Sequence, residues 1–209
     1  MFDFIKIRAV PKTSWSSEET FNLKPRLKTI MALVVGLILF GLGEALLVAS
    51  QIGVSPWTAL GQGLSNVSEL GLGLTTFLIS LFVLFLWIPL KQKPGIGTVL
   101  NAIIISLVLH FAIPFLPIFE ENFPRLIQAI LGVFITGIGG GIYLIANLGP
   151  GARDGLMIGL QQKTNFPIAS VRAFIEISVV TVGWYLGGTV GVGTMLFAFG
   201  IGPAVALGL

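Results

Sequence analysis

Long hydrophobic stretches follow one another along the chain, separated by short polar segments. There are six, at about residues 29–51, 72–90, 97–117, 126–148, 167–188 and 193–209. A helix that rises about 1.5 Å per residue needs roughly 20 apolar residues to cross a hydrocarbon core of about 30 Å, and the first five stretches are long enough. Because these runs lack the alternating pattern of a membrane β-barrel, they predict an all-α fold, a polytopic membrane bundle of six transmembrane helices.

The two ends of the chain depart from this pattern. Residues 1–28 carry six of the twelve basic residues and no apolar run long enough for a signal peptide, so we interpret them as a polar cytoplasmic N-terminal tail. Residues 29–209 then form the membrane domain. Its sixth stretch reaches Leu209 in mid-pattern after about 17 residues, so we expect the last helix to be truncated.

The composition agrees with burial in lipid and argues against several kinds of site. Hydrophobic residues make up 55% of the chain and charged residues 10%, against about 25% charged in an average soluble domain. The lipid bilayer is therefore its expected surroundings. The absence of cysteine and the single histidine, His110, argue against disulfides, thiolate chemistry and a zinc cluster. Without a nucleotide-binding loop or a Ser/His/Asp arrangement, we expect no enzyme, no cofactor, no metal and no nucleic-acid partner.

The basic residues are distributed unevenly between the loops. They concentrate before the first stretch, between the second and third, and between the fourth and fifth, at Lys24, Arg26, Lys28, Lys91, Lys93, Arg153 and Lys163. The positive-inside rule places such loops in the cytoplasm. With six crossings, both ends of the chain are then expected to be cytoplasmic.

The chain matches itself at an offset of 96 residues. The segment GLGEALLVASQIGVSPWTALGQGL, from Gly41, aligns with GIGGGIYLIANLGPGARDGLMIGL, from Gly137, and KPGIGTVLNAI aligns with TVGVGTMLFAF at the same offset. One offset for two separate blocks indicates a duplication, with repeats at about residues 29–118 and 125–209. Each repeat holds three crossings, an odd number, so the copies are expected to be inverted, as in many secondary transporters.

Each repeat also contains a glycine turn followed by a short segment. In the first repeat, Ser55 suits an N-cap and Pro56 suits the first turn of a helix. In the second, Asp154 lies in the first turn, where a negative charge favours the helix dipole. Each segment has about 12 residues, or roughly 18 Å of helix, which is too short to span a membrane. We therefore expect two short interfacial or re-entrant helices.

The second glycine turn carries two adjacent charges, Arg153 and Asp154, where the first repeat has Trp57 and Thr58. Since the repeat can be built without these charges, the fold alone does not demand them. In a functional interpretation, Arg153 and the free N–H groups of the two helix starts hold an anionic group in a shared cavity, and Asp154, Ser55 and Trp57 are further candidate residues of this site. In the alternative, Asp154 caps its helix and Arg153 meets lipid phosphate.

Polar side chains inside the hydrophobic stretches are further candidates, because each is costly in lipid unless it is paired or hydrated. Arg172 and Glu176 are four residues apart on one helix face and can pair, either as a structural contact or beside Arg153 in the site. Glu44 has no basic residue within a turn, so it is either a proton- or cation-coupling residue or a buried, hydrogen-bonded carboxyl. Asn147 either hydrogen-bonds between helices or contributes to the site.

Three segments, ANLGPGARDGLMIGL, ASVRAFIE and GWYLGGTVGVGTMLFAFGIGP, together resemble the YczE family of bacterial multi-pass membrane proteins, which is related to the YyaS/YitT-like group. The resemblance covers about residues 30–209. It implies a bacterial inner (plasma) membrane location and a transporter-like role, and it supplies no substrate or reaction.

These patterns favour a secondary transporter for a small anionic or zwitterionic solute. A non-transporting membrane scaffold or accessory factor, acting through partner proteins, would have the same fold. A homo-oligomer is compatible with both functions. A membrane enzyme is the least favoured class, because no catalytic constellation is visible.

Overall fold

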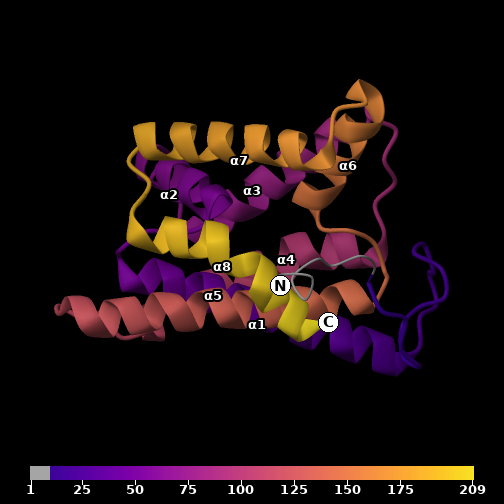
Figure 1. The fold of residues 1–209 in the computed structure, drawn as a ribbon, viewed down its shortest axis with the longest axis horizontal. Helices are drawn as coiled ribbons and strands as arrows, with labels where there is room; N and C mark the ends of the chain where they lie inside the picture. The colour runs from indigo at the N-terminus through magenta and orange to yellow at the C-terminus, as the bar shows by residue number, and fades with distance from the viewer. Residues whose placement is uncertain (1–9) are drawn as a thin grey trace, which may run out of the picture.

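The chain forms an all-helical bundle in the computed structural model, which describes residues 10–209 (Figure 1). Its helices are α1 (Leu27–Ser50), α2 (Pro56–Ser68), α3 (Leu72–Leu86), α4 (Ile96–Ala112), the 3-10 turn η2 (Ile113–Phe115), α5 (Asn122–Ile145), α6 (Ala152–Thr164), α7 (Ile168–Tyr185) and α8 (Val192–Gly208). Each predicted hydrophobic stretch is mostly helical, and the two predicted short segments are the separate helices α2 and α6. The predicted all-α class is therefore confirmed.

Four helices are long and apolar enough to cross a membrane: α1, α4 together with η2, α5 and α7. The pair α2 and α3 adds a fifth if it is counted as one span bent by 114°. Helix α8 is apolar but has 17 residues, and α3 alone has 15, fewer than the roughly 20 that a straight span requires. The structure thus has four or five candidate spans, and the six crossings stay a prediction.

The second half of the chain repeats the local structure of the first. Helix α2 begins at Pro56 and α6 begins 96 residues later, at Ala152, and the starts of α3 and α7, and of α4 and α8, differ by the same 96 residues. The turns agree as well, because φ is 127° at Gly53 and 114° at Gly149, values that side-chain-bearing residues rarely adopt. Segments that match in sequence therefore adopt matching backbone conformations.

Glycines bring α1 and α5 into backbone contact. A Cβ atom at Gly36 would lie 2.9 Å from the carbonyl oxygen of Gly139, and one at Gly132 would lie 2.8 Å from the carbonyl oxygen of Gly43. Neither position has room for a side chain. Such small residues allow the close packing that stabilises helix pairs in lipid. The two crossing points are reciprocal, since Gly36 and Gly132, like Gly43 and Gly139, are 96 residues apart.

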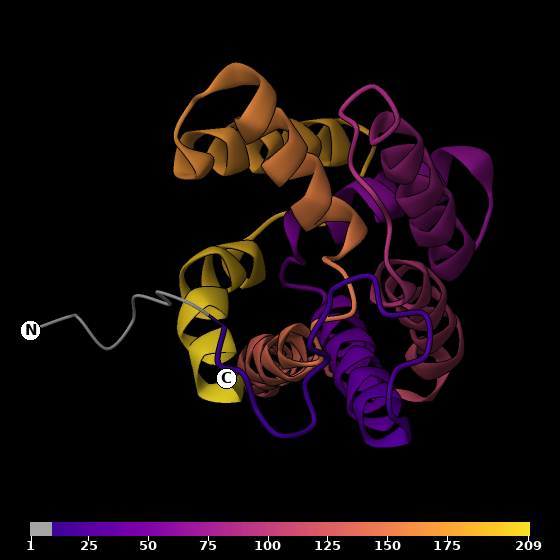
Figure 2. The same ribbon diagram turned by 90° about the vertical axis from the view of Figure 1, so that its right-hand side faces the viewer.

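The loops that precede the two short helices lie near the middle of the molecule (Figure 2). The backbone N–H of Gly97, in α4, donates to the carbonyl of Leu148 at 2.7 Å, and that of Gly193, in α8, donates to the carbonyl of Ile52 at 2.9 Å. Each loop is therefore held by the last helix of the other half. Each short helix also packs on the third helix of the other half, α2 on α7 and α6 on α3. This exchange of contacts brings the starts of α2 and α6 together.

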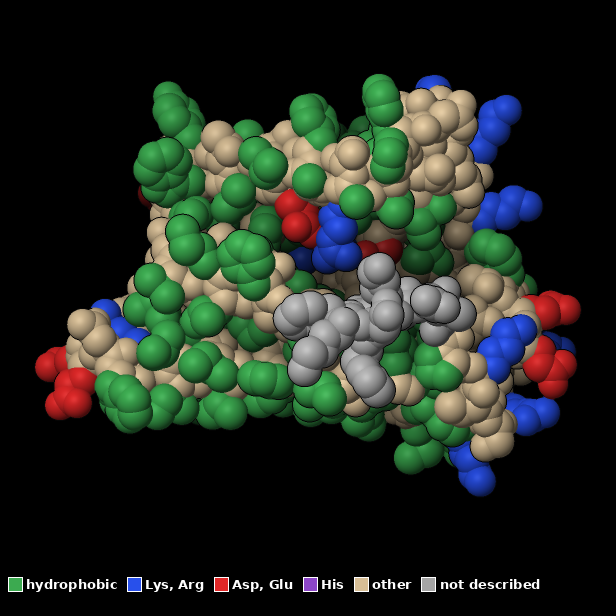
Figure 3. All heavy atoms as spheres, in the orientation of Figure 1, with side chains coloured by type: hydrophobic (Ala, Val, Ile, Leu, Met, Phe, Trp, Pro, Cys, Tyr) green, Lys and Arg blue, Asp and Glu red, His purple; other side chains and the backbone are tan. Residues whose placement is uncertain are grey.

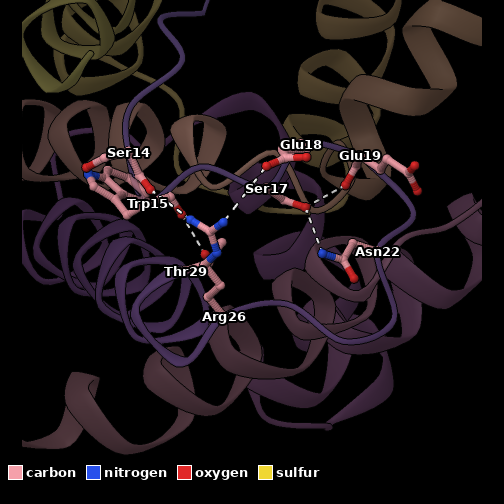
Figure 4. A network of polar contacts seen from close by, with 8 residues as sticks. All are labelled: Ser14, Trp15, Ser17, Glu18, Glu19, Asn22, Arg26 and Thr29. Atoms are coloured by element: carbon pink, nitrogen blue, oxygen red, sulfur yellow. Dashed lines mark hydrogen bonds and ion pairs between the residues drawn. The ribbon is translucent and has the colours of Figure 1, made fainter.

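Part of the predicted tail packs on the helices (Figure 4). Ser17 is 5% exposed, and its backbone N–H donates to the carbonyl of Ala146 at 3.1 Å. The hydroxyl of Thr29, in α1, donates to the carbonyl of Trp15 at 2.5 Å. The segment around Ser17 is therefore part of the folded structure. Residues 1–9 of the predicted tail lie outside the described residues.

Candidate functional site

A cavity of about 250 Å³ lies where the starts of α2 and α6 meet the neighbouring helices. Six of the eight predicted site residues line it: Ser55, Trp57, Arg153, Asp154, Arg172 and Glu176. In the space-filling view, acidic and basic side chains gather in the middle of a largely hydrophobic face, next to α7 (Figure 3). The other two predicted residues, Glu44 and Asn147, are not among the residues that line the cavity.

The guanidinium of Arg153 stacks on the indole ring of Trp57, with its central carbon 5.2 Å from the ring centroid. This is a cation–π contact between the second residues of α2 and α6. Arg153 is half-buried, yet no residue in the described part of the chain accepts a hydrogen bond from it or forms an ion pair with it. The buried Nε1 of Trp57 likewise has no acceptor among residues 10–209. Two side chains with free donors thus border the cavity.

Asp154 lies in the first turn of α6, as predicted, where its charge favours the helix dipole. The hydroxyl of Tyr143, in α5, donates to its Oδ2 at 2.7 Å. The carboxylate therefore bonds to a neighbouring helix, and it lines the cavity directly beside Arg153.

Glu44 is 1% exposed and lies in α1, behind the cavity wall. Ser55 and Thr58 both donate hydroxyl hydrogen bonds to its Oε2, at 2.7 and 2.6 Å. The other oxygen, Oε1, is buried and has no partner among residues 10–209. The partner that the sequence required from elsewhere is thus a pair of hydroxyls at the start of α2.

The acidic groups are arranged alike in the two halves. Thr58 and Asp154 are equivalent positions, 96 residues apart. Each bonds to the long helix that precedes its own short helix, Thr58 to Glu44 in α1 and Asp154 to Tyr143 in α5. In the first pair the short helix provides the hydroxyl and the long helix the carboxyl group, and in the second pair the long helix provides the hydroxyl and the short helix the carboxyl group. A carboxyl group therefore accompanies the start of each short helix.

Arg172 and Glu176 form the predicted pair on α7, with Nε of Arg172 2.8 Å from Oε1 of Glu176. The arginine side chain is 53% exposed and the glutamate 27%, so the pair lies at the open side of the cavity. No group of three or more His, Cys, Asp and Glu side chains that could hold a metal ion occurs within residues 10–209. Among these residues, the charged side chains of the cavity are therefore two arginines, each next to one acidic residue: Arg153 with Asp154 and Arg172 with Glu176.

Asn147 holds the N-terminal segment. Its Nδ2 donates to the carbonyl of Ser17 at 2.9 Å, and its Oδ1 accepts from the hydroxyl of Thr20 at 3.1 Å. Both ends of the amide are thereby used in a contact between the tail and the loop before α6. The sequence could not reveal this, because the partners lie more than 100 residues away along the chain.

Four further polar residues line the cavity that the sequence did not assign to the site: Thr76, Ser80, Asn101 and Tyr143. The hydroxyl of Thr76 is buried and has no partner in the described chain. In the sequence, such residues could be recognised only as polar side chains inside an apolar stretch. The signal is weak, because serine and threonine are common in packed membrane helices.

The chain matches the model of a family of unknown function, DUF6198, over residues 27–208. An uncharacterized protein of Haemophilus influenzae is 41% identical over 200 residues, which make up 96% of this chain and 91% of that protein. No solved structure matches the chain.

Two proteins of Bacillus subtilis are also similar. The uncharacterized membrane protein YczE is 33% identical over 165 residues, which cover 78% of this chain and 77% of YczE. The uncharacterized protein YyaS is 25% identical over 166 residues, which cover 78% of this chain and 83% of YyaS. The resemblance indicated by the glycine-turn and Arg-x-x-x-Glu segments is thereby confirmed. With its several candidate spans, the chain is a membrane protein homologous to bacterial YczE, and it belongs to the DUF6198 family.

Proposed function

We propose that this chain is a secondary transporter of a bacterial inner membrane, and that it moves a small anionic or zwitterionic solute through the cavity between α2 and α6. Its two halves, α1 to α4 and α5 to α8, act as repeats of inverted topology. The equal spacing of helix starts and the reciprocal loop contacts support this arrangement. In transporters of this kind the substrate site lies at the interface between repeats and is approached by the N-termini of short helices.

The free guanidinium of Arg153 is the observation that carries the proposal. It is half-buried at the cavity wall and has no hydrogen-bond acceptor among the described residues. A guanidinium offers five N–H donors in a planar fork that matches a carboxylate or a phosphate. Leaving such donors unpaired in a partly buried site is costly, so an anionic group of the solute is the natural partner.

Acidic side chains at the same cavity favour a solute that also carries a positive charge. Asp154 keeps a carboxylate beside Arg153, and Glu176, which is paired with Arg172, adds another at the open side. An ammonium group two or three bonds away from a carboxylate would find both charges matched. This distribution explains why a zwitterion fits the site as well as a simple anion does.

The loops before the short helices supply the flexible points for a change of access. Gly53 and Gly149 have positive φ in a backbone that connects a long helix to a short one. Rocking of one half against the other, around the contact between Trp57 and Arg153, would open the cavity to each side of the membrane in turn.

A proteoliposome uptake screen against pools of radiolabelled metabolites tests the proposal. The variants are Arg153→Lys, Arg153→Met and, as the matched control, Lys163→Met, which removes an exposed cation from the far end of the same helix. We expect uptake of at least one anionic or zwitterionic pool, a loss of more than tenfold in Arg153→Met, and full activity in Lys163→Met.

Absence of uptake for every pool, with a protein that copurifies with the chain, would contradict transport. It would favour the accessory function instead. An equal loss of uptake in Arg153→Met and Lys163→Met would show that transport does not depend on this cavity.

A further inference from the structure

A second cavity lies against the first and is almost wholly apolar. It measures about 510 Å³, is open on one side, and is bordered by α2, α3, α7 and Leu156 of α6. Its lining consists mainly of aliphatic and phenylalanine side chains, among them Leu60, Leu78, Phe82, Leu156, Phe174 and Val179. Three hydroxyl residues also reach it, but each hydroxyl donates to a backbone carbonyl: Ser68, Thr75 and Ser178. The apolar cavity therefore offers a ligand contact area and no free hydrogen-bonding group from these residues.

The two cavities share one thin wall. On α3, Thr76 lines the polar cavity and its neighbour Thr75 lines the apolar one; on α7, Glu176 and Ile175 divide in the same way. Trp57 lines both cavities. Successive residues of the same helices thus face a polar space on one side and an apolar space on the other.

At this wall the charge comes close to the apolar space. The guanidinium carbon of Arg153 lies 5.2 Å from the indole centroid of Trp57, on the polar side. The cation therefore contacts a residue that also lines the apolar cavity. The Nε1 of the same ring is buried and has no acceptor in the described chain, so a second donor is present at the junction.

We infer that the substrate is an amphiphile with a small anionic head and a hydrocarbon chain. This inference rests on the transport function proposed above and specifies its substrate class. The head accepts hydrogen bonds from Arg153 and from Nε1 of Trp57, and the chain lies in the apolar cavity. The first cavity is lined by charged side chains, including Arg153, and the second by none from the described residues, as suits the head and the hydrocarbon chain of such a molecule.

The bilayer makes this division favourable. A hydrocarbon chain that passes from lipid into the apolar cavity stays in surroundings as apolar as lipid, so its transfer costs little. The head leaves the membrane surface for charge-assisted hydrogen bonds with a guanidinium, which are stronger than neutral ones. A fully hydrophilic solute would use the polar cavity and leave the apolar one without a role.

A chain-length series tests the inference. The purified full-length protein in phosphatidylcholine nanodiscs is incubated with radiolabelled decanoate. Unlabelled n-carboxylates from acetate to dodecanoate are then added as competitors. Empty nanodiscs correct for partitioning of these compounds into lipid. We expect the displacing concentration to fall by up to about fourfold per added carbon, the limit set by about 0.8 kcal/mol per CH₂, and then to level off when the cavity is filled. Decyltrimethylammonium, with the opposite head charge, should not displace decanoate.

Two matched variants test whether the hydrocarbon chain of the ligand lies in the apolar cavity. Ser178→Phe places a ring in the apolar cavity, and the equivalent position of the first half already carries a phenylalanine, Phe82. Thr181→Phe places the same ring on the same helix outside the cavity, where the threonine hydroxyl likewise bonds to its own helix backbone. We expect Ser178→Phe to flatten the chain-length profile and Thr181→Phe to keep it. Equal melting temperatures verify that both variants are folded. The chain-length profile of the unmodified protein tests the inference even if a variant fails to fold.

Equal displacement by acetate and decanoate would overturn the inference, and so would displacement by decyltrimethylammonium or an unchanged profile in a folded Ser178→Phe protein. A flat profile together with Arg153-dependent uptake of a short hydrophilic anion would leave the transport function standing without an amphiphile. Chain-length-dependent binding without movement of decanoate across the bilayer would contradict transport and keep the binding site.

Discussion

Trp57 and Arg153 occupy equivalent positions in the two halves of the chain, 96 residues apart, and their side chains stack on each other. This contact joins the start of α2 to the start of α6. The glycine turns before these two helices have similar φ values, whereas the two side chains differ in chemistry, an aromatic ring in α2 and a cation in α6. Both side chains line the same cavity.

A double-mutant cycle measures this contact. We expect Trp57→Leu and Arg153→Met to be coupled by about 0.5 to 2 kcal/mol in the free energy of unfolding, because a cation over an indole gains that much when it is partly desolvated. Reversible unfolding in mixed detergent micelles supplies the four free energies. The cycle of Trp57→Leu with Lys163→Met should give no coupling. Additive effects of the first pair would show that the stacking contributes nothing.

Glu44 acts as the acceptor for two buried hydroxyls. In Glu44→Ala, the hydroxyls of Ser55 and Thr58 lose that acceptor, so we expect about 1 to 3 kcal/mol of destabilisation. Glu44→Gln keeps an oxygen in place and should cost clearly less. The same unfolding measurement decides, with the exposed Glu69→Gln as control. Equal losses in Glu44→Ala and Glu44→Gln would indicate that the charge matters and the hydrogen bonds do not.

The sequence predicted features that depend on neighbours along the chain. The spacing of Arg172 and Glu176 defines one helix face, and the structure joins them. Ser55 lies at the predicted N-cap position of α2 but forms no cap bond, because its hydroxyl donates to Glu44 instead. The glycine turns at Gly53 and Gly149 and the two short helices after them follow from local glycine and proline signals. In each case the relevant atoms are within a few residues of one another, where backbone geometry alone fixes their separation.

Contacts between distant segments could not be predicted in the same way. Nothing in the local pattern shows that Tyr143 of α5 reaches Asp154, or that the amide of Asn147 binds the segment around Ser17. These contacts depend on how helices pack and how loops return. The match at an offset of 96 residues identifies which positions of the two halves correspond, but it does not show which of them are in contact.

The crossing of α1 and α5 gives a prediction on stability. A Cβ at Gly139 would lie 2.5 Å from the carbonyl oxygen of Gly36 and 3.0 Å from the carbonyl carbon of Leu39. Because backbone atoms cannot move aside cheaply, Gly139→Ala should cost about 1 to 3 kcal/mol in the free energy of unfolding. The control is Gly202→Ala in α8, where nothing lies within 4 Å of the added atom. Similar stability of the two variants would contradict the close crossing.

The amide of Asn147 is predicted to hold the N-terminal segment in place. Asn147→Gly keeps the backbone conformation, since φ is 51° there, and removes the side-chain bonds to Ser17 and Thr20. At about 0.5 to 1.5 kcal/mol per bond, backbone amides around Ser17 should exchange hydrogen roughly tenfold faster. The control is Asn165→Gly, an exposed position with the same turn conformation after α6.

Hydrogen exchange combined with uptake then separates the two roles considered for Asn147. Faster exchange around Ser17 with unchanged uptake assigns the residue to the tail contact, because its amide groups are already occupied there and are not among the groups that line the cavity. Unchanged exchange with a loss of uptake would reverse that assignment and return Asn147 to the substrate site. The distinction is testable because the glycine variant alters only the side chain, while the turn that positions α6 and Arg153 keeps its backbone.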